Sequence, residues 1–96
     1  MVQLTGVFWS KQAEKTYIDY LKSSPHLAHK IQILIDDIME NGLLVGLGKP
    51  EPLKHYDPPK YSRHIDRGIR LIYSVRNTLS GSILWIDSCD SHYDDH

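Results

Sequence analysis

Glu51 is a carboxylate placed between two prolines in a segment that is otherwise basic. Pro50 and Pro52 restrict the backbone on both sides of it, and Pro52 also drives Glu51 out of the helical region. Lys49 and Lys54 lie close by in the sequence. A phosphate-binding surface normally excludes a carboxylate unless that group accepts a proton, so we interpret Glu51 as a candidate general base. The simpler alternative is an ion pair with Lys49 or Lys54.

Basic side chains gather around this segment, although the whole chain has a net charge of -1. Residues 49–76 contain seven lysines and arginines against three acidic residues. Arg63 and Arg70 would meet on one face of a sheet, where their guanidinium groups beside Lys49 and Lys54 would bind phosphate, and His64 could also contact such a ligand. The alternative is that these are solvated charges on a strand face.

His92 would complete an acid-base pair with Glu51. Imidazole, with a reference pKa of about 6.5, donates a proton at neutral pH more readily than a carboxyl group does. Glu51 would take the proton of a 2′-hydroxyl, His92 would protonate the departing 5′-oxygen, and an arginine would stabilise the phosphoryl group. This cleavage of RNA needs no metal and no cofactor. The alternative is that His92 is an ordinary exposed residue.

A zinc site is a competing interpretation of the last residues. Cys89, His92 and His96 have spacings found among zinc ligands. A structural site needs a fourth ligand, which would have to come from elsewhere in the chain.

Composition indicates one compact domain that is not secreted. Ninety-six residues with 41% hydrophobic content suit a single core. Cys89 is the one cysteine, which excludes an intramolecular disulfide and favours a reducing compartment. We find no secretion signal and no apolar run of membrane-spanning length, so we expect a cytoplasmic protein without a membrane partner.

The hydrophobic pattern predicts two helices and four strands. A strand is expected over Gln3–Trp9, then a helix over Lys11–Lys22 with Ser10 as its N-cap. A second helix should begin at Pro25 and end at Asn41-Gly42, with one apolar stripe made of Leu27, Ile31, Leu34, Ile35 and Ile38. Three more strands are predicted over Tyr61–Ile65, Ile69–Arg76 and Ser82–Ser91.

These elements predict an α+β fold of order βααβββ. The sheet should be an antiparallel meander with the two-helix hairpin packed on one face. Tyr73 and Trp85 are expected to fill the core beneath the helices.

Four stretches carry a resemblance to a known family. They are Gly46–Lys54 (GLGKPEPLK), Tyr61-Ser62-Arg63, Arg70-Leu71-Ile72-Tyr73 and His92-Tyr93. With them the chain resembles the YoeB/Txe family of bacterial toxins, within the RelE-like group. The resemblance implies a single RelE-like toxin domain over residues 1–96, with a short acidic C-terminal extension at residues 94–96.

The resemblance also implies an activity and its residues. Members are mRNA endoribonucleases that act in the ribosomal A site and leave a 2′,3′-cyclic phosphate and a 5′-hydroxyl. Glu51 matches the general base, Arg70 the arginine that stabilises the transition state, His92 the general acid and Tyr93 a residue that positions the substrate. Lys54 and Arg63 match basic positions that contact RNA, and we expect Lys49 and His64 to contact RNA beside them.

The implied partners are a cognate antitoxin, the ribosome and mRNA. The resemblance leaves a homodimer open and implies contact with operator DNA only through the antitoxin. The chain departs from the family at Asp90, at His64 and in its acidic last residues, which reduce the positive field available for phosphate. The alternative function is a non-catalytic module that binds RNA or protein with its basic strand face.

Overall fold

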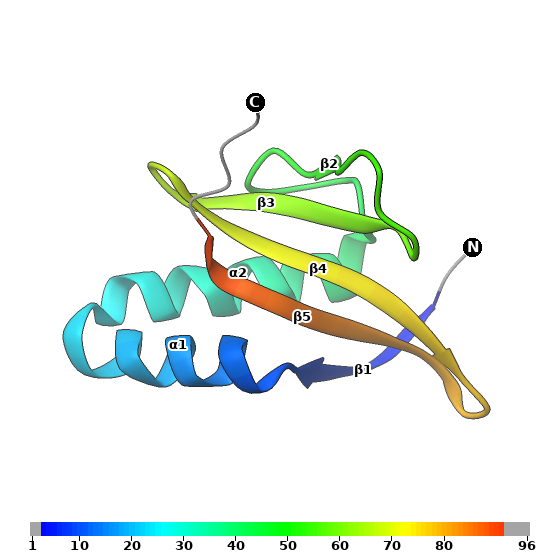
Figure 1. Ribbon diagram of the computed structural model, residues 1–96, viewed down its shortest axis with the longest axis horizontal. Coiled ribbons are helices and arrows are strands. Elements are labelled where there is room, and N and C mark those ends of the chain that lie inside the picture. Colours follow the sequence, from blue (N-terminus) through cyan, green and yellow to red (C-terminus); the bar gives the residue numbers. More distant parts are fainter. Residues whose placement is uncertain (1–2, 92–96) are drawn as a thin grey trace.

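The chain folds into a five-stranded sheet with two helices against one face (Figure 1). This computed structural model describes residues 3–91. The elements in chain order are β1 (Leu4–Trp9), α1 (Lys11–Ser23), α2 (Pro25–Asn41), β2 (Glu51–Pro52), β3 (Lys60–Asp66), β4 (Ile69–Thr78) and β5 (Gly81–Ser91). The strands are arranged in the order β1-β5-β4-β3-β2. The predicted α+β fold is confirmed.

Two details of the sheet differ from the expectation. The first strand lies parallel to β5, so the sheet is mixed and only β2 to β5 form an antiparallel meander. The two-residue strand β2 was not predicted, because a segment with two prolines has few backbone donors to offer a sheet. It pairs at the edge of β3, where a missing donor is tolerated.

Local sequence explains where the helices begin and end. The Ser10 side chain accepts a hydrogen bond from the Ala13 amide at 3.0 Å, which caps the start of α1. Pro25 occupies the first turn of α2, where its missing amide costs nothing. Gly42 follows the last turn with a φ of 101°, a conformation that glycine adopts without strain.

The core lies between the helices and one face of the sheet. All five residues of the predicted α2 stripe are buried, and they pack with the buried Leu71, Tyr73, Leu84 and Ile86 of β4 and β5. Alternation along β4 turns Arg70, Ile72 and Ser74 to the opposite face. This second face, away from the helices, is called the open face below.

Trp85 does not fill the core as expected. It pairs in register with Ser74, which places it on the open face, whereas its neighbour Ile86 pairs with Tyr73 on the core side. The Trp85 ring stacks on Phe8 with centroids 4.3 Å apart, and the Arg76 guanidinium lies 4.2 Å from its centroid. Within residues 3–91, neither helix is both long and apolar enough to cross a membrane.

Candidate active site

Glu51 and Arg70 meet at the edge of the open face. The Arg70 Nη1 atom donates to Glu51 Oε1 at 3.0 Å. Pairing of β2 with β3 and of β3 with β4 brings these residues together from 19 positions apart in the chain. The Glu51 side chain is 49% exposed and that of Arg70 is 15% exposed, so both remain accessible to a ligand. The ion-pair partner of Glu51 within residues 3–91 is thus Arg70, in place of Lys49 or Lys54.

Arg63 does not lie on the accessible surface. Its side chain is fully buried on the core side of β3, and all five guanidinium N–H groups have an acceptor within 3.1 Å. The acceptors are Tyr73 Oη, Asp37 Oδ2 and the carbonyl oxygens of Gly42, Val45 and Leu47. The prediction that Arg63 contacts RNA is therefore wrong for this structure, because no donor is left for a phosphate.

Arg63, Asp37 and Tyr73 together hold the loop that precedes β2; we call these three residues the arginine hub. Tyr73 donates to the carbonyl of Leu43 at 2.5 Å, and Asp37 accepts from the Leu47 amide at 3.0 Å. The hub thus bonds to backbone groups of residues 42, 43, 45 and 47. The loop is fixed although it contains no helix or strand.

Charges inside the hub affect one another. The hydrogen bond from the Leu47 amide, followed by that from Arg63, lowers the pKa of Asp37 below its ordinary value. Burial raises the pKa of the Tyr73 phenol, which stays protonated and can donate to Leu43.

The hub leads directly to Glu51. The His64 amide donates to the Gly48 carbonyl at 2.7 Å, and the Leu53 amide donates to the Lys60 carbonyl at 2.9 Å. These two bonds join the chain to β3 on either side of Glu51. The local stiffness that the prolines provide is thus extended by contacts with the sheet.

A cavity of about 470 Å³ with basic walls opens beside this segment. Its lining consists of Lys30, Gly48, Lys49, His64, Ile65, Asp66 and Arg67. Asp66 accepts a hydrogen bond from the Arg67 amide at 2.8 Å, so its carboxylate is engaged in the hairpin turn. Among residues 3–91, no carboxylate forms an ion pair with Lys30, Lys49 or Arg67. We refer to this cavity of about 470 Å³ as the basic cavity.

Two of the predicted RNA-contacting residues, Lys49 and His64, line the basic cavity, and two unpredicted ones, Lys30 and Arg67, join them. Lys30 is on α2, and its sequence position on the polar side of that helix resembles that of any solvated lysine. Only the packing of α2 on β3 reveals that Lys30 lines the cavity. Lys54 is exposed in the segment between β2 and β3, outside the cavity lining.

The predicted general acid His92 and its neighbour Tyr93 lie outside the described residues. The last described residue, Ser91, pairs with Arg70 in the register between β4 and β5. The backbone of β5 therefore ends beside the Glu51–Arg70 pair.

Ser62 has an unusual environment next to this pair. It is fully buried, and its hydroxyl has no hydrogen-bond partner among the described residues. The register places Ser62 directly opposite Glu51 on one side and opposite Ile72 on the other. Its side chain consequently faces the open face together with Glu51.

Cys89 is a core residue. It is fully buried, and its thiol donates to the Ala13 carbonyl of α1 at 3.5 Å. Burial, with a further contribution from Asp90, raises the pKa of Cys89 to about 12. Residues 3–91 contain no cluster of three or more His, Cys, Asp or Glu side chains that could hold a metal ion. The proposed zinc ligands His92 and His96 lie outside this range.

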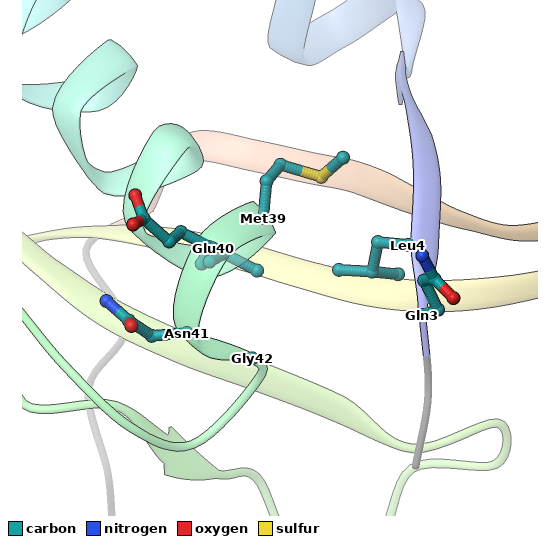
Figure 2. Close-up of a pocket in the computed structure, with 7 residues that line it drawn as sticks. Gln3, Leu4, Met39, Glu40, Asn41 and Gly42 are labelled. Atoms are coloured by element: carbon teal, nitrogen blue, oxygen red, sulfur yellow. The ribbon is translucent and has the colours of Figure 1, made fainter.

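A second cavity, of about 510 Å³, lies between the end of α2 and the start of β1. Figure 2 shows Met39 and Leu4 pointing toward one another across it, while Glu40 and Asn41 point away. Its lining offers no pair of groups for proton transfer. The Glu51–Arg70 pair remains the better candidate for chemistry.

Comparison with known proteins gives a consistent result. Residues 9–93 match the family described as YoeB-like toxins of bacterial type II toxin-antitoxin systems. The chain is 33% identical to toxin YoeB of Escherichia coli K12 over 87 residues, which are 91% of this chain and 98% of that protein.

Solved structures agree with the sequence comparison. The YoeB dimer from Staphylococcus aureus is 35% identical with a TM-score of 0.82, over 96% of this chain and all of that one. A YoeB/ParE toxin from Agrobacterium tumefaciens is 30% identical with the same TM-score, over 93% of this chain and all of that one. The YoeB-YefM heterotetramer from S. aureus is 35% identical with a TM-score of 0.79, over 96% of this chain and all of the matched chain.

Proposed function

The chain belongs to the family of YoeB-like toxins of bacterial type II toxin-antitoxin systems, and on that premise we propose that it is an mRNA endoribonuclease that acts on translated mRNA in the ribosomal A site. The observation that carries the proposal is the 3.0 Å contact between Glu51 and Arg70. A proton acceptor and a phosphate-binding donor lie side by side on an accessible sheet edge.

The reaction is an internal displacement at phosphorus. Glu51 takes the proton of the 2′-hydroxyl while the 2′-oxygen forms its bond to phosphorus. The bond from phosphorus to the 5′-oxygen breaks, and that oxygen takes a proton from His92. Arg70 donates to the phosphoryl oxygens, where charge increases in the transition state, and Tyr93 positions the substrate. The products are a 2′,3′-cyclic phosphate and a 5′-hydroxyl, and no metal or cofactor takes part.

RNA would follow the basic cavity next to the reacting groups. Lys49 belongs both to the cavity lining and to the segment that holds Glu51. His64 is opposite Arg70 in the register of β3 and β4 and also lines the cavity. Phosphates that enter the cavity would therefore be continuous with the phosphate held by Arg70. Lys54 supplies a further cation on the same segment.

The partners follow from the family. YoeB of S. aureus forms a heterotetramer with YefM and has also been solved as a dimer. We propose that a cognate antitoxin inhibits this chain, and that an acidic segment of the antitoxin covers the basic cavity and separates Glu51 from its substrate. The protein would act in the cytoplasm, where its ribosomal target is found.

Expression without antitoxin tests the proposal. The wild-type chain should arrest growth and cut translated mRNA, and Glu51→Gln should relieve both effects because a neutral amide cannot accept the proton. His92→Gln should do the same. Glu40→Gln is the matched control, since Glu40 is an exposed carboxylate of α2 outside the site. Equal cleavage by Glu51→Gln and wild type would refute the proposed mechanism.

The same experiment separates the alternative function. Growth arrest with intact mRNA would indicate a non-catalytic module that binds RNA or protein with the basic strand face.

A further inference from the structure

The Ser62 hydroxyl is a buried polar group without a hydrogen-bond partner in the part of the chain that the structure describes. Nearly all buried side-chain hydroxyls in folded proteins have a hydrogen-bond partner, because water would otherwise have provided one. Ser74 on the adjacent strand follows this rule: it is also buried, and its hydroxyl donates to Asp87 Oδ2 at 3.0 Å. Ser62 does not follow it among the described residues. A hydroxyl that reduces stability is best explained by a state other than the resting one.

The position of Ser62 indicates what that state is. Residues directly opposite one another on antiparallel strands have their Cβ atoms about 5 Å apart and on the same face. Glu51 is opposite Ser62 in this way. The glutamate side chain is long enough to bring its carboxylate to the Ser62 hydroxyl by rotation about its own bonds.

In the resting structure, Glu51 is held by Arg70. In the proposed reaction Arg70 must also donate to the phosphoryl oxygens, so it no longer serves Glu51 alone. At the same moment Glu51 has to be oriented toward the 2′-hydroxyl. A further donor would hold it there, and Ser62 lies directly across from it.

We propose that Ser62 is a positioning residue, whose hydroxyl donates to the Glu51 carboxylate once a substrate phosphate has taken Arg70. This inference rests on the proposed function. A hydroxyl donor at this position would orient the carboxylate toward the 2′-hydroxyl while the guanidinium group contacts the phosphate.

Ser62→Ala tests the inference in single-turnover cleavage of mRNA on programmed ribosomes. The cleavage rate should fall about tenfold, the value of one missing hydrogen bond in the transition state. The dependence of the rate on pH should differ from that of the wild type, since the missing hydroxyl contacts the group that accepts the proton. Binding to ribosomes with mRNA that carries a 2′-deoxy group at the cleaved position should stay within about twofold.

The melting temperature separates positioning from a structural role. Ser62→Ala removes an unpartnered hydroxyl and should leave the melting temperature unchanged or raise it. Ser74→Ala is the matched control: it breaks the bond to Asp87, so it should lower the melting temperature without moving the pH profile. Ser62→Thr keeps the hydroxyl and should restore the cleavage rate. If the larger side chain of threonine lowers stability, Ser62→Cys supplies a weak donor and should restore part of the cleavage rate.

Three results distinguish failure of this inference from failure of the proposed function. Full cleavage by Glu51→Gln would refute both the proposed function and the role of Ser62. Loss of cleavage in Glu51→Gln with a normal rate and pH profile in Ser62→Ala would overturn only the role of Ser62. A melting temperature lowered in Ser62→Ala as much as in Ser74→Ala, with an unchanged pH profile, would show that Ser62 is structural.

Discussion

Arg63 Nη1 lies 2.6 Å from Asp37 Oδ2, and this contact joins β3 to α2 inside the protein. Burying a guanidinium group is costly unless every donor is satisfied, and here all five have acceptors. The acceptors include three carbonyl groups of one loop. The buried guanidinium group of Arg63 therefore stabilises the conformation of the loop that precedes Glu51.

Arg63→Met should destabilise the protein strongly. The substitution leaves the Asp37 carboxylate and three loop carbonyls without their donor, and breaking a buried pair in this way typically costs about 3–5 kcal/mol. The free energy of unfolding in urea measures the effect. Arg67→Met is the control, because Arg67 is exposed in the β3–β4 turn and its removal should change stability by less than about 0.5 kcal/mol.

Arg63→Lys distinguishes the contribution of the five guanidinium donors from that of the positive charge. The measurement is again the free energy of unfolding in urea. A lysine has three donors in place of five and cannot span the acceptors of the hub, so it should recover only part of the stability that Arg63→Met removes. Full stability with lysine would show that a positive charge alone is sufficient.

The stability of the protein should depend on Asp37 in acid. Its folded pKa is lowered, chiefly by the Leu47 amide, so it contributes stability above the unfolded value of about 3.9. This contribution is lost as the pH falls through the folded pKa. The difference in unfolding free energy between wild type and Asp37→Asn should thus be largest near pH 6 and shrink below about pH 4.

A neighbouring carboxylate provides the control for this profile. Asp36 accepts a hydrogen bond from Gln32 in the same helix and is exposed. Asp36→Asn should change the free energy of unfolding near pH 6 by less than about 0.5 kcal/mol. A constant difference between wild type and Asp37→Asn over the whole range would contradict the assignment.

Gly48→Ala should disturb the approach to Glu51. Gly48 has a φ of +79°, and an added Cβ would lie 2.9 Å from a methyl carbon of Leu34 and 3.0 Å from the His64 carbonyl oxygen. We expect a decrease of about 2 kcal/mol in the free energy of unfolding and a lower rate of mRNA cleavage.

Gly42→Ala serves as its control. Gly42 also has a positive φ, of +101°, but an added Cβ would meet nothing within 4 Å. It should cost only the backbone strain, about 1 kcal/mol, and should leave cleavage unchanged. Equal effects of the two substitutions would mean that close packing around Gly48 is unimportant.

Charge reversal in the basic cavity should weaken RNA binding in a salt-dependent way. For Lys30→Glu in the Glu51→Gln background, the slope of log K against log salt should fall by about 0.7 for each RNA phosphate that the variant no longer neutralises. A single-stranded RNA oligonucleotide is a suitable probe, and Lys15→Glu on α1 is the control, since Lys15 is exposed and outside the cavity lining. An unchanged slope for Lys30→Glu would exclude the cavity from the RNA path.

The sequence was most informative where the hydrophobic pattern is regular. The apolar stripe of α2 has helical spacing, and a helix with one apolar stripe must bury it against another element, so its five residues could be assigned to the core. The convergence of Glu51 and Arg70 was not predicted, because it depends on the pairing of β2 with β3. The strand order, however, depends on which edge accepts β1, and alternation alone does not decide this.

Arg63 was misassigned because residue type does not reveal burial. An arginine on a short strand between polar neighbours has the pattern of a surface cation. Its real environment depends on the loop of residues 42–47, whose carbonyl groups are identical in every sequence. The same limit applies to Ser62 and Lys30, whose positions beside Glu51 and in the cavity wall depend on register and helix packing.

The pairing of β1 with β5 brings the two halves of the chain together, with Leu4 beside Ser82 (Figure 1). A ribosome makes β1 first, but its neighbour in the sheet is β5, which is also the strand that ends beside Arg70. The edge that carries Glu51 and Arg70 can therefore be completed only after β5 has been synthesised. If the protein acts on ribosomes as proposed, a nascent chain would stay inactive toward the ribosome that is making it.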